Sequence, residues 1–416
     1  MTTATAGERA REAAGGGEVP VRWVWLAAWP VTAVFVLSNA ATPLYVLWQR
    51  EMGFGRGTLT VVFACYIAGL LGSLLVCGIA SDRVGRKPVL LPALGLALVA
   101  CLVFATAGGV GALITARLCT GIAVGAVVSA GMAAVTDVAG PARRRLAALL
   151  ASCAMVFGAG LGPLLAGVLS ETLPGPAVTV FAVEAVLLVS AVVVVVRMPV
   201  GAAHEGRGEG GRGAGGWVRV PGVPRGAGGQ LALGIAVFAP GITATSFVLS
   251  LGPSLLAGLL GTGSRVVSGA LAFAMFLSAT GVQFAVRRLG RRTVLAYGAG
   301  ATALGMAALV LAVRTESVAA LAGAALLAGA GQGMGQLGGL SLLNSAVPGA
   351  RLAEANAALN VGGYLPAGLL PVSAGYLSDA VGLTTGATVF GTVLAGLAVA
   401  GGGVVLLGRR RASSAT

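Results

Sequence analysis

The chain has 416 residues, of which 57% are hydrophobic and 10% are charged, and its formal net charge is +14. A soluble globular domain carries about 25% charged residues, so this composition excludes that class. The mean hydropathy of +0.94 indicates that most side chains face lipid or other apolar helices.

Twelve segments are long and apolar enough to cross a membrane as helices, since a spanning helix needs about 20 mostly apolar residues. We therefore predict an all-α membrane protein. The predicted spans are residues 23–48, 59–80, 88–108, 111–136, 146–169, 177–197, 230–256, 266–286, 293–313, 317–341, 354–377 and 384–407.

Three polar segments divide the chain into two halves. Residues 1–22 are predicted to be a disordered tail, and the glycine-rich residues 199–229 a flexible linker. Residues 409–416 are predicted to be a second tail. The predicted domains are therefore two six-helix bundles, 23–198 and 230–408.

The distribution of basic residues predicts the orientation in the membrane. If the N-terminus is cytoplasmic, the inner segments hold 22 of the 27 basic residues and the outer loops hold four. We expect both termini to be cytoplasmic. One lysine among many alanines and glycines is typical of a GC-rich bacterial genome, so we expect the bacterial inner (plasma) membrane.

The positive charge does not indicate nucleic-acid binding. A nucleic-acid reader needs its basic residues on one solvated face, whereas here they are scattered over short loops. Contact with the lipid bilayer, including anionic inner-leaflet lipid, accounts for them. We expect no nucleic-acid partner and a monomer.

The scarcity of reactive side chains excludes most catalytic sites. The chain has one histidine, His204, which lies in the predicted linker, and five cysteines without Cys-x-x-Cys spacing. A Ser-His-Asp set, a Cys-His set or a metal site is therefore excluded, and no P-loop is present. We expect no enzyme activity, no cofactor and no metal.

The loop between the second and third spans is the most specific motif. It reads Gly-x-x-x-Asp-Arg-x-Gly-Arg-Lys, comprising Gly78, Asp82, Arg83, Gly85, Arg86 and Lys87. A degenerate copy, residues 287–292, recurs half a chain later, as two homologous halves require. The motif resembles the gate loop of the major facilitator superfamily of transporters, which implies twelve helices in two homologous six-helix bundles.

That resemblance implies a gate at this loop. It implies that Asp82 holds the inner ends of the halves together when the cavity faces outward. Physically, the Asp82 carboxylate can cap the start of the eleventh span or pair with Arg86 or with arginines 143–145. Asp137, at the inner end of the fourth span, is a predicted partner of Arg83.

Two further stretches resemble family motifs. In the fourth span, Arg117 begins an Arg-x-x-Thr-Gly stretch similar to the family's Arg-x-x-Gln-Gly. In the fifth span, the stretch that contains Gly158, Gly162, Pro163 and Gly167 resembles the antiporter motif of the exporting branch. Glycines four apart also serve as plain packing faces. A Gly-x-Leu-Ser-acid sequence occupies both 167–171 and 375–379, a second sign of an internal repeat.

Two charges lie well inside predicted spans. Charges in hydrocarbon cost roughly 2.5–3.5 kcal/mol on insertion scales and usually mark function. Arg117 and Glu184 lie at similar depth, so an ion pair between them is possible. Either the pair is structural, or Glu184 carries the coupling proton, with Asp137 as the alternative carboxylate.

Uncharged polar side chains in the spans are candidates for substrate contacts. In the family the first, fourth, seventh and tenth helices line the central cavity, which ranks Asn39, Gln332 and Gln336 first. Hydrogen bonding between helices is the alternative. The predicted cavity residues are Asn39, Tyr45, Gln332, Gln336 and Asn360.

The sequence thus predicts a secondary transporter that works by alternating access. The leading hypothesis is proton-coupled efflux of a small organic molecule. A sugar or metabolite facilitator or symporter is the first alternative, and a substrate sensor that has lost transport is the second. The first span lacks the acidic residue common in exporters of cationic drugs, which argues against cationic drugs.

Overall fold

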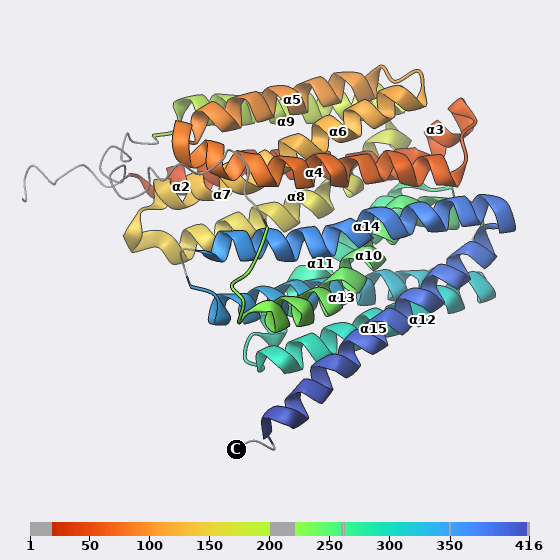
Figure 1. The fold of residues 1–416 in the computed structure, drawn as a ribbon. Helices are drawn as coiled ribbons and strands as arrows, with labels where there is room; N and C mark the ends of the chain where they lie inside the picture. Colours follow the sequence, from red (N-terminus) through yellow and green to blue (C-terminus); the bar gives the residue numbers. More distant parts are fainter. Residues whose placement is uncertain (1–18, 200–220, 259–260, 262, 349–350, 414–416) are drawn as a thin grey trace, which may run out of the picture.

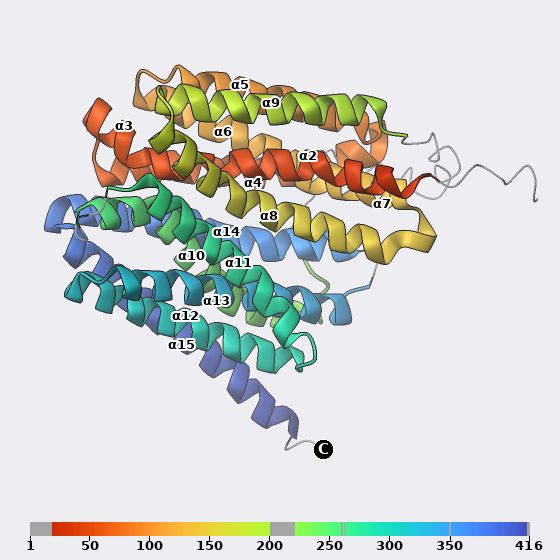
Figure 2. The ribbon, with the colours of Figure 1, turned by 180° about the vertical axis from the view of Figure 1, so that it is seen from behind.

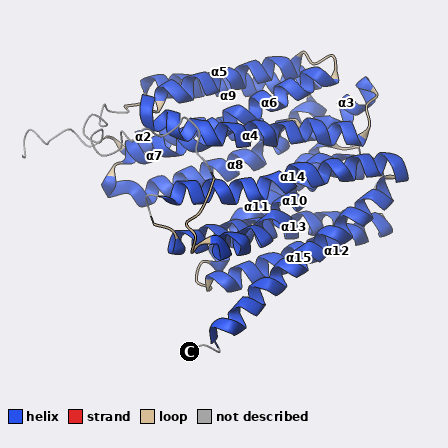
Figure 3. Ribbon diagram, in the orientation of Figure 1, coloured by secondary structure: helices blue, strands red, loops and turns tan. Residues whose placement is uncertain are grey.

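The computed structural model describes residues 19–199, 221–258, 261, 263–348 and 351–413. Within these ranges every regular element is a helix (Figure 3). Most of the predicted tail 1–22 and linker 199–229 lies outside the described residues.

The first half contains six spans. They are α2 (Val21–Ala40), which continues through a 3-10 turn (Thr42–Leu44) into α3 (Tyr45–Met52); α4 (Arg56–Val84); α5 (Lys87–Ala105); α6 (Val110–Ala126), which continues through a π-helical turn (Val127–Gly131) into α7 (Met132–Ala139); α8 (Arg144–Thr172); and α9 (Pro176–Arg197).

The second half also contains six spans. They are α10 (Gly228–Gly258), α11 (Arg265–Val286), α12 (Arg291–Thr315), α13 (Val318–Ala346), α14 (Leu352–Val381) and α15 (Leu383–Ser413). The last helix extends into residues 409–416, where the sequence predicted a tail. Eleven spans among the described residues are long and apolar enough to cross a membrane. The remaining one, α14, is less apolar because it contains Asn356, Asn360 and two prolines.

The spans run alternately up and down, so the bundle has two ends. We call the end that carries the loops at 85–86, 140–143 and 287–290 the basic end, and the opposite end the far end. Figures 1 and 2 show the two halves side by side, with α3 at the far end and the C-terminus at the basic end.

Two predicted spans are interrupted. The first span was expected to be one helix over 23–48, but α2 ends at Ala40 and a 3-10 turn follows. Pro43 explains the break, because proline has no N–H to donate to the preceding turn. In the fourth span the π-helical turn at Val127–Gly131 separates α6 from α7. Such turns often occur at functional sites.

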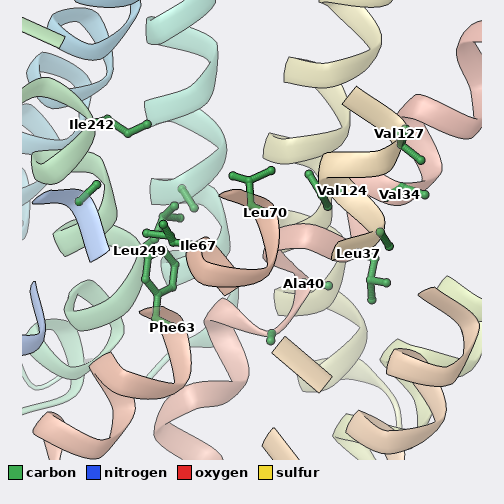
Figure 4. Packing of buried hydrophobic residues seen from close by; sticks show 14 of the residues in the cluster. Val34, Leu37, Ala40, Phe63, Ile67, Leu70, Val124, Val127, Ile242 and Leu249 are labelled. Carbon is green, nitrogen blue, oxygen red and sulfur yellow. The ribbon is translucent and has the colours of Figure 1, made fainter. Parts of the chain in front are cut away.

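The two halves meet through two related helix pairs. α4 packs against α14, and α8 packs against α11. In each pair one helix comes from either half. Buried side chains also cross the boundary, and Figure 4 shows Phe63 and Ile67 of α4 close to Leu249 of α10. These contacts place the interior of the molecule at the boundary between the halves.

Within the first half, α8 approaches α2 closely at glycine. A Cβ atom on Gly162 would overlap the carbonyl group of Val36, and one on Gly158 would lie 2.5 Å from the carbonyl oxygen of Thr32. These two glycines therefore pack α8 against α2. The structure thus gives a packing reason for the glycines of the fifth-span motif, the alternative that the sequence left open.

The close approach at Gly162 leads to a stability prediction. Gly162→Ala should lower the melting temperature of the detergent-solubilised protein, because the Val36 main chain must move and overpacking typically costs about 1–3 kcal/mol. The matched control is Gly95→Ala in α5, where a Cβ would meet no atom within 4 Å. Alanine there should keep or raise the melting temperature. Equal melting temperatures for the two variants would contradict the packing interpretation.

Candidate functional site

A central cavity lies between the two halves. It encloses about 820 Å³ of empty space, including the part that is open to solvent. Both halves contribute to its wall, through α2, α4 and α8 from the first and α10, α11, α13 and α14 from the second. Its polar lining residues are Asn39, Tyr66, Thr245, Ser246, Thr280, Gln283, Gln332, Gln336 and Tyr364.

The lining combines aromatic rings with uncharged polar groups. The first half supplies Phe35 and Phe63, and the second half supplies Phe276. Among the described lining residues there is no carboxylate and no basic side chain. The cavity therefore suits a small molecule with an apolar body and hydrogen-bonding groups.

The structure places three of the five predicted cavity residues in this wall. They are Asn39, Gln332 and Gln336, and their role in binding remains a prediction. Tyr45 is wrong as a lining residue, because its ring is fully buried beside Arg117. Asn360 is also wrong, since it lines a separate pocket between α4 and α14.

Several lining residues were missed by the sequence analysis. Tyr66 and Phe63 are three apart in α4 and share a helix face. Thr245 and Ser246 lie in the middle of α10. The spacing of these residues along each helix showed which of them share a face. It did not show which face is turned toward the cavity, because the rotation of each helix about its axis is not given by the sequence.

The Asn39 side chain also donates to a main-chain carbonyl that lacks its helical hydrogen bond because of a proline. Pro163 has no N–H, so the carbonyl of Ala159, four residues earlier, loses its helical partner. The Asn39 amide nitrogen lies 3.4 Å from that oxygen and 3.0 Å from Ser38 Oγ. The first span and the fifth-span motif are thus joined at the cavity wall.

Arg117 lies directly behind the cavity wall and is fully buried. Its Nη1 donates to the Ser38 carbonyl at 2.7 Å, near the end of α2, where helix carbonyls lack partners. Its guanidinium carbon lies 5.1 Å from the Tyr45 ring centroid and 5.9 Å from those of Phe63 and Tyr66. Neither Nε nor Nη2 has an acceptor among the described residues.

Glu184 does not pair with Arg117, so the ion pair that their similar depth made possible does not form. Glu184 is 2% exposed, and within the described chain it forms no ion pair. Phe104 lies 5.8 Å from the guanidinium and stacks on Phe181 at 4.6 Å, one helical turn from Glu184. Similar depth in the membrane did not determine whether the two side chains meet.

The predicted gate loop forms a compact ion-pair network at the basic end. Arg86 donates through Nη1 to Asp82 at 2.7 Å and through Nε to Asp137 at 2.8 Å. The same Nη1 lies 2.9 Å from Ser81 Oγ. Burial lowers the pKa of Arg86, but Asp137 and Asp82 outweigh this effect and raise the pKa above its usual value. Arg86 therefore stays charged while it joins the second and fourth spans.

The partner of Asp137 differs from the expected one. The sequence paired Asp137 with Arg83, whereas the structure pairs it with Arg86. Gly85 has a φ of 97°, a conformation that favours glycine and turns Arg86 back toward both carboxylates. Lys87 donates to the carbonyl of Val196 at 2.9 Å. Gly78 lines the pocket between α4 and α14.

The far end is closed by two carboxylates that bind the starts of helices in the other half. Asp379, at the end of α14, accepts from the main-chain N–H of Arg56 at 2.9 Å and of Gly57 at 2.8 Å. Glu171, at the end of α8, accepts from the N–H groups of Arg265 and of Val266. We call these the Asp379 clamp and the Glu171 clamp.

The two clamps are equivalent by the internal repeat. Each carboxylate ends a Gly-x-Leu-Ser-acid sequence, and each partner helix begins with an arginine. The first N–H groups of a helix have no partner within it and carry partial positive charge, so a carboxylate satisfies both needs. Other cross-half hydrogen bonds at this end include Ser254 to Gln49 at 3.0 Å.

Metal binding finds no support in the described residues. No group of three or more His, Cys, Asp or Glu side chains lies together there. The chemistry available to the site is therefore hydrogen bonding, aromatic contact and charge.

Comparisons with known proteins agree with this arrangement. The model of the Major Facilitator Superfamily matches residues 24–287. The nucleoside transporter NupG, solved as a point mutant, has a TM-score of 0.70 at 12% identity, covering 92% of this chain and 99% of that chain. The inward-open xylose transporter XylE from E. coli has a TM-score of 0.71 at 15% identity, covering 91% and 94%. At these identities the structures show a shared fold.

Curated relatives match a shorter part of the chain. The 3-(3-hydroxy-phenyl)propionate transporter of Escherichia coli (strain K12) is 32% identical over 133 residues, which are 32% of this chain and 31% of the relative. The major facilitator-type transporter psiT2 of Psilocybe cubensis is 36% identical over 125 residues, or 29% of this chain and 23% of the relative. The match thus spans a third or less of each relative's length.

The clamps lead to a prediction about the far end. Asp379→Asn should increase the population of molecules with an open far end by about tenfold, because charge-assisted hydrogen bonds contribute roughly 1.5–3 kcal/mol. Spin labels at Glu51→Cys and Thr385→Cys, in a background with the native cysteines replaced by serine, report the separation of the halves. Double electron–electron resonance should show a longer distance between the two labels in the variant.

Two comparisons sharpen this test. Glu171→Gln should act in the same direction, since its clamp is equivalent by the internal repeat. Glu316→Gln, an exposed carboxylate in the loop after α12, should leave the distances unchanged. If Asp379→Asn and Glu316→Gln give the same distance distribution, the clamp does not hold the far end closed.

Proposed function

The chain belongs to the Major Facilitator Superfamily, and from this premise we propose that it exports a small organic molecule in exchange for protons. It is a multi-pass membrane transporter of a small molecule. Export, the proton and the cytoplasmic position of the basic end are the parts that we propose.

The central cavity is the observation that supports transport most strongly. It lies between the two halves and draws its wall from seven helices of both. The clamps close the far end, while the Arg86 network joins the second and fourth spans at the basic end. Alternating access needs a site between two halves and contacts between the halves that can break, as the clamps can at the far end.

Proton coupling rests on Glu184. A carboxylate in hydrocarbon is costly, and binding a proton removes much of that cost. Glu184 is buried, and its Oε2 has no hydrogen-bond partner among the described residues. Asp137 is the alternative proton carrier, and it pairs with Arg86.

Export rests on the resemblance of the fifth-span motif to the antiporter branch. The Pro163 carbonyl lies where a Cβ on Gly269 of α11 would overlap it, so the motif meets the other half directly. A bend at this contact would change the seam between the halves.

Uptake of an organic acid with protons is the second candidate. The curated relative named as a 3-(3-hydroxy-phenyl)propionate transporter supports it, and so do the aromatic rings of the cavity. A sensor without transport remains the third possibility.

Flux in proteoliposomes tests the proposed function. Substrates should first be selected by a ligand-stabilisation screen that includes aromatic acids, amides, amines and sugars. An imposed pH gradient should then drive the selected solute against its concentration gradient, with protons moving in the opposite direction. Co-movement of protons would favour the uptake candidate, flux that ignores the pH gradient would favour a facilitator, and no flux of a bound ligand would favour a sensor.

Glu184 provides the coupling prediction. Glu184→Gln should abolish the response of flux to the pH gradient while downhill exchange of substrate continues, because the amide cannot exchange a proton. The measurement is the proton-to-substrate ratio in the same proteoliposomes. An unchanged ratio would show that Glu184 has a structural role, and Asp137 would then be the candidate for the proton carrier. Glu51→Gln, an exposed carboxylate at the far end, is the control.

Asp82 provides the gate prediction. Asp82→Asn should reduce transport at least about tenfold while the protein remains expressed and folded, because Arg86 loses one of its two carboxylates. Initial rates of flux measure the effect. If the loop served only to set the membrane topology, it would need its positive charges and not the Asp82 carboxylate, and the variant would lose no transport. Near-normal rates would therefore reject the gate role.

A further inference from the structure

The guanidinium of Arg117 is an unmatched positive charge behind the substrate cavity. It is fully buried, and Nη1 alone has an acceptor, the Ser38 carbonyl. Nε and Nη2 have no acceptor of good hydrogen-bond geometry among the described residues. The buried Tyr45 hydroxyl lies close enough to the guanidinium to interact with it, but it forms no well-aligned hydrogen bond either. Two guanidinium donors therefore lack a well-placed acceptor.

The aromatic surroundings compensate the charge in part. The guanidinium carbon lies 5.1–5.9 Å from four ring centroids, those of Tyr45, Phe63, Tyr66 and Phe104. Such contacts are attractive, but they provide no acceptor for the remaining N–H groups. A buried donor without an acceptor is costly, and more so when it is charged.

The charge is separated from the cavity by a thin wall. Phe63 and Tyr66 contact Arg117 and also line the cavity, and Asn39 follows the residue whose carbonyl Arg117 binds. A cavity ligand could reach the guanidinium only if the Tyr66 side chain turned, because Tyr66 lies against both. Glu184, the other buried charge, forms no ion pair with Arg117 among the described residues.

We propose that the transported molecule is an organic anion with an aromatic or apolar body, and that Arg117 binds its carboxylate. The planar guanidinium offers Nε and Nη2 as adjacent donors, which suits a carboxylate bound through both oxygens. The aromatic wall then holds the body of the molecule, and the glutamines of α13 bind its polar substituents. This inference rests on the proposed function and narrows its substrate class.

A structural role for Arg117 makes a different prediction. If Arg117 only caps the end of α2 at Ser38, a lysine that keeps the charge and one donor should serve nearly as well, and ligand preference should not change. The test therefore compares ligands that differ in charge, and variants that differ in donor geometry.

The experiment measures equilibrium binding of 3-phenylpropionate and of its neutral isostere 3-phenylpropionamide to the purified full-length protein. The unmodified protein should bind the acid roughly 10- to 100-fold more tightly than the amide, as expected for charge-assisted hydrogen bonds. Arg117→Gln should abolish this preference while its affinity for the amide is kept. Arg117→Lys should retain the fold and lose most of the preference, because the paired donors are gone.

Controls separate this inference from folding and from the proposed function. Arg314→Gln, an exposed arginine at the far end, should keep the preference, and melting temperatures show which variants remain folded. Equal affinities for acid and amide, no binding of either, or an unchanged preference in Arg117→Lys and Arg117→Gln would overturn the assignment. Proton-driven flux of a neutral or cationic solute would overturn it as well, while leaving the proposed function intact.

Discussion

Close contact between helices of different halves is the constraint on which the rest of the structure depends. Within a bilayer, main-chain polar groups must find partners in the protein, because lipid offers none. Near the membrane surface the first N–H groups of α4 and α11 meet this need through carboxylates of the opposite half. The same contacts determine where the two halves touch and where the cavity begins.

Small residues make this contact possible. A Cβ on Gly375 of α14 would lie 2.8 Å from the Arg56 carbonyl oxygen, and one on Gly167 of α8 would overlap the Arg265 carbonyl. Each clamp carboxylate lies four residues after such a glycine, on the same helix face. The glycine permits the approach and the acid then stabilises it, so the repeated Gly-x-Leu-Ser-acid sequence acts as a unit.

The sequence predicted the elements well and the contacts between them less well. Hydropathy and the charged loops located the spans, because spanning helices have a strong and simple signal. Arg86 was one of the partners that the sequence offered for Asp82, and the structure pairs them. Asp137, the predicted partner of Arg83, pairs with Arg86, the other arginine of the same loop. The possible pair of Arg117 with Glu184 does not form, because depth along a helix does not give its rotation. Tyr45 was misplaced for the same reason, since the turn at Pro43 changes the direction of the helix that follows.

The donors and the acceptors of the clamps depend on the amino-acid sequence to different degrees. Their donors are main-chain groups, which every residue except proline possesses, while their acceptors are single carboxylates. At the start of α11, the Val266 side chain can therefore change without loss of the bond, whereas Glu171 cannot. The start of α4 is more constrained, because a Cβ on Gly57 would lie 2.5 Å from the Tyr376 ring and the Arg56 side chain lies 3.8 Å from Asp379. A search for co-varying residue pairs would therefore miss the bond from Val266 to Glu171, although it joins the two halves of the molecule.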